Sequence, residues 1–185
     1  MAEPAALRRT PAIPAIPGVR LLPPAARFIL RAGGRALGIA GKALGIDETP
    51  GSCRASQAGM RAALWLGPDE YLLLAPEAEA PGLASALEQA LQGEPHALVD
   101  VSQRQTALEI SGSRAADILS SGCPLNLDVT AFPVGMCTRT VFAKAEIVLW
   151  RMAGDTFRLE VWRSFTDYVA CYLDEVAREY GASAK

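Results

Sequence analysis

Two halves of this chain resemble each other, and this internal repeat constrains the fold more than any other feature of the sequence. Residues 27–40 (RFILRAGGRALGIA) align without a gap on residues 106–119 (TALEISGSRAADIL), and residues 64–74 align on residues 149–161 through a shared Leu-Trp pair. A separation of about 80 residues is too long for a solenoid repeat, so it favours one duplication of a small unit. Chance similarity between short segments is the alternative.

Hydrophobic periodicity predicts the same order of elements in both halves, β-α-β-β-α. Apolar residues at helical spacing predict helices over residues 82–92, 112–122 and 166–180. Pairs of short apolar runs around a turn predict hairpins within residues 64–74 and 146–162. Residues 47–61 have the Gly, Ser and Pro content of a loop.

These elements define an α+β fold in which one domain, residues 25–181, contains two repeats at about 27–92 and 106–180. We expect the repeats to superpose about a pseudo-twofold axis, with their strands in the same order. The second repeat is longer by about six residues, which lie within 121–145. The last residues, 182–185, are expected to fray.

The N-terminal residues 1–24 are predicted to be an extended arm. They hold six of the thirteen prolines, and each proline fixes φ and removes a backbone donor, which excludes a helix or a central strand. Residues 1–46 also carry seven Arg or Lys residues against one acidic residue. A basic arm on an acidic body suggests a protein surface as its partner, and a solvated tail is the alternative.

Composition excludes several classes of protein. The net charge of −2 lacks the basic footprint of a nucleic-acid-binding domain, so no nucleic-acid partner is expected. No apolar run approaches the length of a membrane span, and prolines interrupt the segment after Arg8-Arg9 where an export signal needs an apolar stretch. The four cysteines contain no CxxC pair and suit free thiols in a reducing cytoplasm.

Catalytic motifs are absent from the sequence. It contains no P-loop, G-x-S-x-G, H-E-x-x-H or G-x-G-x-x-G pattern, and His96 is the only histidine. Pairs of acidic residues fall in turns, loops and on a helix face, where solvation accounts for them. We therefore predict no catalytic, cofactor-binding or metal-ligating residue in this chain.

Basic and aromatic residues gather between Arg139 and Arg163. Alternation along a strand places Arg158, Glu160 and Trp162 on one face, away from the apolar residues of the same strand. Tryptophan and arginine on a polar face are typical of interface anchors. The predicted interface residues are Arg139, Lys144, Trp150, Arg151, Trp162 and Arg163. The alternative is that Trp162 covers its own hairpin while the arginines are solvated.

A run of motifs in the same region resembles a known family. CPLNLD (123–128), FPVGMCTRT (132–140), KAEIVLW (144–150) and DTFRLEVWRSFTDYV (155–169) are similar to the gamma subunit of heterotetrameric sarcosine oxidase. Further similar stretches are LWLGPDEYLLLAP (64–76) and VDVSQRQTALEISG (99–112), so the resemblance covers most of residues 62–180.

The resemblance implies a fold related to the folate-binding domain of the aminomethyltransferase family. It also implies a non-catalytic structural subunit, with alpha, beta and delta subunits as partners, in a complex that oxidatively demethylates sarcosine to glycine. That reaction forms hydrogen peroxide and methylene-tetrahydrofolate. By the same resemblance, FAD, FMN, NAD, tetrahydrofolate and zinc belong to the partner subunits, and none is bound by this chain.

The alternative function is a stand-alone folate-dependent one-carbon transferase of the aminomethyltransferase type. Asp100, in the VDVS segment, is the acidic residue to inspect for such a role. Buried hydrogen bonding to the following turn is its competing, structural role.

Overall fold

The computed structural model describes Ile13 and residues 16–182, with side chains up to Glu179. Strands in this part of the chain form two five-stranded antiparallel sheets. The first sheet has the spatial order β3 (Ala55–Ala58), β4 (Arg61–Gly67), β5 (Glu70–Pro76), β2 (Ala25–Ala32) and β6 (His96–Asp100). The second has the order β8 (Cys137–Phe142), β9 (Ala145–Ala153), β10 (Thr156–Trp162), β7 (Gln105–Ser111) and β1 (Val19–Leu21).

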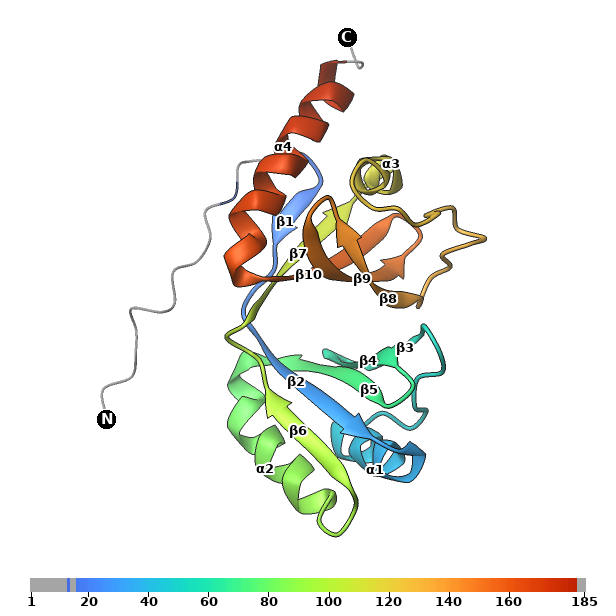
Figure 1. Ribbon diagram of the computed structural model, residues 1–185, viewed down its shortest axis with the longest axis vertical. Coiled ribbons are helices and arrows are strands. Elements are labelled where there is room, and N and C mark those ends of the chain that lie inside the picture. Colours follow the sequence, from blue (N-terminus) through green and yellow to red (C-terminus); the bar gives the residue numbers. More distant parts are fainter. Residues whose placement is uncertain (1–12, 14–15, 183–185) are drawn as a thin grey trace, which may run out of the picture.

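Helices cover the outer face of each sheet, so the chain has four layers, α/β/β/α (Figure 1). The first sheet carries α1 (Gly34–Leu44) and α2 (Ala80–Ala90), and the second carries α3 (Ala115–Ser120) and α4 (Thr166–Ala182). Short 3₁₀ turns, η2 (Glu77–Glu79) and η3 (Arg163–Phe165), lead into α2 and α4. The predicted helices at 82–92, 112–122 and 166–180 therefore correspond to α2, to a shorter α3 and to α4.

Three apolar cores hold these layers together. One lies between the first sheet and α1 with α2, and a second lies between the second sheet and α3 with α4. The third core joins the inner faces of the two sheets, and it contains Ala62, Leu64, Leu66, Leu72, Leu74, Cys137, Val148 and Trp150. Because each sheet is apolar on both faces along β4, β5 and β9, these strands lack a simple two-residue alternation.

Two strands cross between the sheets. β1 precedes β2 in the chain but pairs with β7 of the second sheet, and β6 precedes β7 but pairs with β2 of the first. The exchange is reciprocal, and both exchanged strands are edge strands. The predicted arm, residues 1–24, therefore ends in an edge strand, while residues 1–12 and 14–15 lie outside the described residues.

The two sheets have the same strand order when β3, β4, β5, β2 and β6 are matched with β8, β9, β10, β7 and β1. The predicted repeat requires this order. The first half nevertheless contains one more strand than predicted, because the loop expected at 47–61 includes β3. The segment between α3 and β8, residues 121–136, is longer than its counterpart between α1 and β3, residues 45–54.

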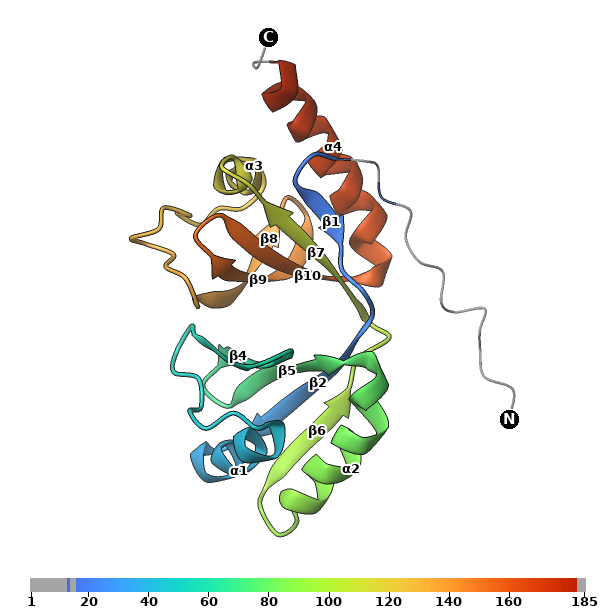
Figure 2. The ribbon, with the colours of Figure 1, turned by 180° about the vertical axis from the view of Figure 1, so that it is seen from behind.

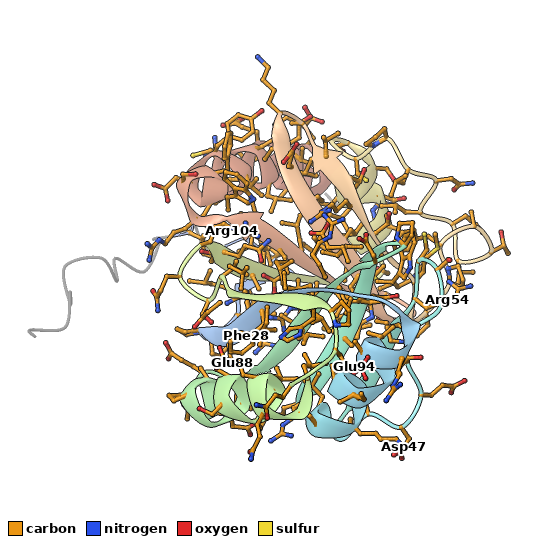
Figure 3. The ribbon with its side chains drawn as sticks, turned by 60° about the horizontal axis from the view of Figure 1, so that its bottom comes forward. Phe28, Asp47, Arg54, Glu88, Glu94 and Arg104 are labelled. Carbon is orange, nitrogen blue, oxygen red and sulfur yellow. The ribbon has the colours of Figure 1, made fainter. Side chains whose placement is uncertain are left out.

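The sheets are also joined at the edge formed by β3 and β8. Arg54 and Met136 form an isolated β-bridge, and the Cys137 amide donates to the Cys53 carbonyl at 3.1 Å. Figure 3 shows Arg54 at this edge and Arg104 near the opposite one, where the chain crosses from β6 to β7. Within the described residues, no helix has the length and apolar content needed to cross a membrane.

Candidate functional site: a partner-binding surface

Two of the six predicted interface residues lie inside the fold. Trp150 is 5% exposed and belongs to the core between the sheets. Arg151 is also 5% exposed, and it donates hydrogen bonds to the carbonyls of Leu127 (3.0 Å), Phe132 (2.8 Å) and Gly154 (2.9 Å). The structure therefore gives both residues a role in packing, and neither offers a surface to a partner.

Arg139 lies on β8 and is exposed, but its guanidinium contacts the first sheet. It forms a bidentate ion pair with the Glu70 carboxylate, in which Nη1 donates to Oε2 at 3.0 Å. This hydrogen bond is the main cause that holds the pKa of Glu70 below its ordinary value, and the nearby Arg31 adds to the effect. Arg139 thus fastens β8 to β5, and its side chain stays 49% exposed.

Trp162 ends β10 and is 44% exposed. The guanidinium carbon of Arg104 lies 5.5 Å from the centroid of its ring, a cation–π contact. The Arg163 amide donates to the Arg104 carbonyl at 2.8 Å, so the β6–β7 connection is fixed against the end of β10. Figure 3 shows Arg104 between the two halves of the chain.

Two further aromatic residues follow Trp162 where the chain enters α4. Phe165 is 40% exposed and Tyr168 is 38% exposed, and their rings meet edge to face with centroids 6.5 Å apart. Together with Arg104 and Trp162 they form what we call the aromatic corner. Of these four residues only Trp162 is among the predicted interface residues, and the sequence signal for the other aromatic residues is their three-residue spacing, Trp162, Phe165 and Tyr168.

A pocket of about 430 Å³ opens beside Trp162, between the two sheets. Its apolar lining includes Ile29, Leu66 and Val148, and its polar lining includes Arg104, Gln105, Arg139 and Glu146. The Gln105 Oε1 atom is buried without a hydrogen-bond partner.

Lys144 lies in the exposed turn between β8 and β9, and Arg163 is half-buried in η3.

The cysteines and the histidine have the following surroundings. All four cysteines are free, and burial raises the pKa of the Cys137 thiol to about 12, so its reactive thiolate form is disfavoured. His96 is exposed, with Nδ1 2.8 Å from the Glu94 carbonyl. Among the described residues, no group of three His, Cys, Asp or Glu side chains is placed to hold a metal ion.

Asp100 has a local structural contact. Its Oδ1 accepts a hydrogen bond from the Ser102 amide at 2.8 Å. The expected bond to the following turn is therefore present, but Asp100 is exposed rather than buried. Such an Asx turn orders the β6–β7 connection that carries Arg104.

Similarity to known proteins identifies the family of this chain. Residues 33–179 match the model of the sarcosine oxidase, gamma subunit family. A sarcosine oxidase subunit gamma from Arthrobacter sp. is 33% identical over 165 residues, which are 89% of this chain and 76% of that protein. The structure also resembles a chain of heterotetrameric sarcosine oxidase from Corynebacterium sp. U-96, with a TM-score of 0.81, 29% identity and coverage of 88% and 84% of the two chains.

A more distant likeness concerns the fold alone. Aminomethyltransferase T of the glycine cleavage system from Bartonella henselae superposes with a TM-score of 0.65 at 15% identity, over 84% of this chain and 45% of that one. The expected relation to the aminomethyltransferase fold is thereby confirmed. The matched family model and the 33% identity to the Arthrobacter protein show that this chain belongs to the sarcosine oxidase gamma subunit family.

Proposed function

We propose that this chain is a non-catalytic subunit that assembles with alpha, beta and delta subunits into a heterotetrameric sarcosine oxidase of the cytoplasm. In this proposal FAD, FMN, NAD, tetrahydrofolate and zinc are held by the partner subunits. The complex demethylates sarcosine to glycine and forms hydrogen peroxide and methylene-tetrahydrofolate. Membership of the family, together with the exposed aromatic corner, is the observation that carries the proposal.

The aromatic corner supports a role in assembly. Trp, Tyr, Phe and Arg are enriched in protein interfaces because each buries a large contact area, and Trp, Tyr and Arg also offer polar contacts. Trp162 is held by the Arg104 cation–π contact, so it loses little conformational freedom on binding. Of the predicted interface residues, Arg139, Lys144, Trp162 and Arg163 remain in this role.

We further infer that the two halves arose by duplication of one α+β unit and are related by a pseudo-twofold axis. The matching strand order and the reciprocal exchange of β1 and β6 support this origin. In this scheme the segment 121–136 is the main place where the second unit has grown.

Co-purification tests the function. The chain is expressed alone and together with the alpha, beta and delta subunits, and each preparation is assayed for sarcosine oxidation, flavin absorbance and folate content. We expect the chain to co-purify with a yellow, active complex and to retain no folate alone. Methylene transfer to tetrahydrofolate by the isolated chain would instead support the stand-alone transferase.

A further inference from the structure

Two of the free cysteines, Cys53 and Cys137, lie opposite each other where the two halves of the chain meet. Arg54 and Met136 form an antiparallel β-bridge between the halves. The Cys137 amide donates to the Cys53 carbonyl at 3.1 Å, so the antiparallel pairing continues to the next pair of residues. Cys53 and Cys137 are therefore cross-strand neighbours.

This register brings the two cysteines within reach of a disulfide. Residues directly opposite in an antiparallel pair have Cα atoms about 4.5–5.5 Å apart. Disulfides usually join residues whose Cα atoms are about 4.4–6.8 Å apart, so the bond needs no large movement of the backbone. The two thiols also interact. Burial is the main cause that raises the pKa of the Cys137 thiol to about 12, and the neighbouring Cys53 adds to the rise.

Cys53 has an unusual backbone conformation. Its φ angle is 55°, and among the described residues Ala143 is the only other non-glycine residue with a positive φ. The Arg54 amide donates to the Gly51 carbonyl at 3.0 Å, which closes a turn around Cys53. Glycine or asparagine is usual at such a turn position, because a Cβ atom is strained there. Backbone strain of this kind gathers at functional sites.

The two thiols differ in their access to solvent. Cys137 is 0% exposed and lies in the core between the sheets, where its thiol donates to the Trp65 carbonyl at 3.5 Å. Cys53 is only half-buried. A small oxidant from solution therefore meets Cys53 first, and the raised pKa of Cys137 disfavours a direct reaction there.

A bond between these cysteines would close the open edge between the two sheets. The chain crosses from one sheet to the other between β1 and β2 and between β6 and β7, and both crossings can be followed in Figures 1 and 2. β3 and β8 are the edge strands on the opposite side of their sheets. The bridge at Arg54 and the ion pair of Arg139 with Glu70 are non-covalent contacts at this side.

We propose that Cys53 and Cys137 are a redox-active pair, which hydrogen peroxide converts into a disulfide that joins the two halves of the chain. The Cys53 thiolate attacks one peroxide oxygen, so an S–O bond forms while the O–O bond breaks, and the hydroxide that leaves takes up a proton. The Cys137 thiol then loses its proton, and its sulfur displaces the oxygen from the Cys53 sulfur as a second water. The two thiols lose two electrons, and one peroxide becomes two waters.

Hydrogen peroxide is a product of the complex in the proposed function. The supply of the oxidant therefore rests on that function, whereas the placement of the two cysteines is a property of the chain alone. Cys53 is the residue oxidised first, and Cys137 is the residue that resolves its sulfenic acid.

The test treats the full chain with stepwise additions of hydrogen peroxide. The protein is then unfolded in urea with N-ethylmaleimide, which blocks the remaining thiols, and is digested with trypsin without reduction. Mass spectrometry should find residues 43–54 linked to residues 115–139, which are the tryptic peptides that contain Cys53 and Cys137. Dithiothreitol should separate the two peptides.

Cys123→Ala is the matched control, because Cys123 lies in the same tryptic peptide as Cys137 and is also buried. The link should persist in this variant and disappear in Cys53→Ala and in Cys137→Ala. Because Cys53 is only half-buried, Cys53→Ala keeps the test decisive if Cys137→Ala does not fold.

The linked chain should also be more stable than the reduced chain, because a disulfide between distant residues restricts the unfolded state. Its unfolding temperature should rise by about 5–15 °C, and peroxide-treated Cys53→Ala should show no such rise. A free Cys137 thiol after Cys53 has been oxidised, or a link through Cys123, overturns the inference. These outcomes do not depend on assembly, so failure of the chain to join the alpha, beta and delta subunits overturns the proposed function alone.

Discussion

Arg27 and Glu160 form a buried ion pair that joins the two sheets. Arg27 lies on β2 of the first sheet and Glu160 on β10 of the second, and their side chains are 2% and 1% exposed. The Arg27 Nε donates to Glu160 Oε2 at 2.7 Å, and Nη1 donates to the Ala25 carbonyl at 3.0 Å. The Arg158 Nε donates to Glu160 Oε1 at 2.8 Å, so one carboxylate serves two arginines.

Removal of the Glu160 charge is predicted to be strongly destabilising. Glu160→Gln leaves Arg27 as an uncompensated buried cation, which should lower the free energy of unfolding by about 3–5 kcal/mol. Arg27→Met should cost less, because Glu160 keeps its contact with Arg158. Urea unfolding of the isolated chain measures both values. In the double variant Arg27→Met with Glu160→Gln, the loss should be well below the sum of the single losses, and additive losses would contradict this account.

The ion pair between Arg139 and Glu70 is predicted to make stability depend on pH. Arg139 holds the pKa of Glu70 below its unfolded value, so the pair stabilises the fold above that unfolded value. This contribution is lost as the pH falls through the lowered pKa of the folded state. Because Arg139 is half exposed, solvent screening limits the loss in Arg139→Gln to about 0.5–1 kcal/mol near neutral pH. The difference from the unsubstituted chain should begin to shrink as the pH falls below the ordinary glutamate pKa of about 4.3, and it should vanish below the lowered pKa of Glu70.

An NMR titration of the Glu70 carboxyl measures this shift directly. Arg139→Gln should raise the pKa of Glu70 toward its ordinary value. Arg114→Gln is the control, because Arg114 pairs with Asp117 on α3 at 3.4 Å and is not among the groups that shift Glu70. An unchanged Glu70 titration in Arg139→Gln would remove Arg139 from this role.

Local patterns in the sequence predict the helices and strands better than they predict what each face of an element packs against. The two-residue period of β10 correctly separated Phe157, Leu159 and Val161, which lie in the core under the helices, from Glu160 and Trp162. It did not show that the charged face turns toward the other sheet. Glu160 is buried with Arg27 as its partner. The two residues lie 133 positions apart in the sequence, so no local pattern contains their contact.

The same limit applies to the candidate site. Trp150 and Arg151 were predicted to be interface residues because aromatic and basic residues are enriched in interfaces. Trp150 instead faces the first sheet. The Arg151 guanidinium donates hydrogen bonds to two carbonyls of the loop between α3 and β8, those of Leu127 and Phe132. β3 was missed because its four residues, ASQA, have little strand propensity and depend on pairing with β4.

Two glycines should respond oppositely to alanine. A Cβ atom at Gly122 would lie 2.9 Å from the ring of Phe142, which is fully buried and packs edge to face on Tyr172. Gly122→Ala should therefore destabilise the chain by about 1–3 kcal/mol through overpacking. Gly38, inside α1, has no atom within 4 Å of such a Cβ, so Gly38→Ala should stabilise by about 0.5–1 kcal/mol. Thermal unfolding compares the two variants, and a change of the same sign in both would contradict this explanation.

The aromatic corner is predicted to contribute to assembly rather than to the stability of the chain. Trp162 is 44% exposed, so Trp162→Ala with Arg163→Ala removes contact area that a partner would bury but little of the core. Retention of the double variant in the co-expressed complex should fall at least about tenfold, as for loss of an interface anchor. Flavin absorbance per assembled complex should not change, because the flavins are proposed to lie in the larger subunits. Met60→Ala, at an exposed apolar position remote in sequence, serves as the control. If the double variant assembles like the control but unfolds at a lower temperature, Trp162 covers its own hairpin instead.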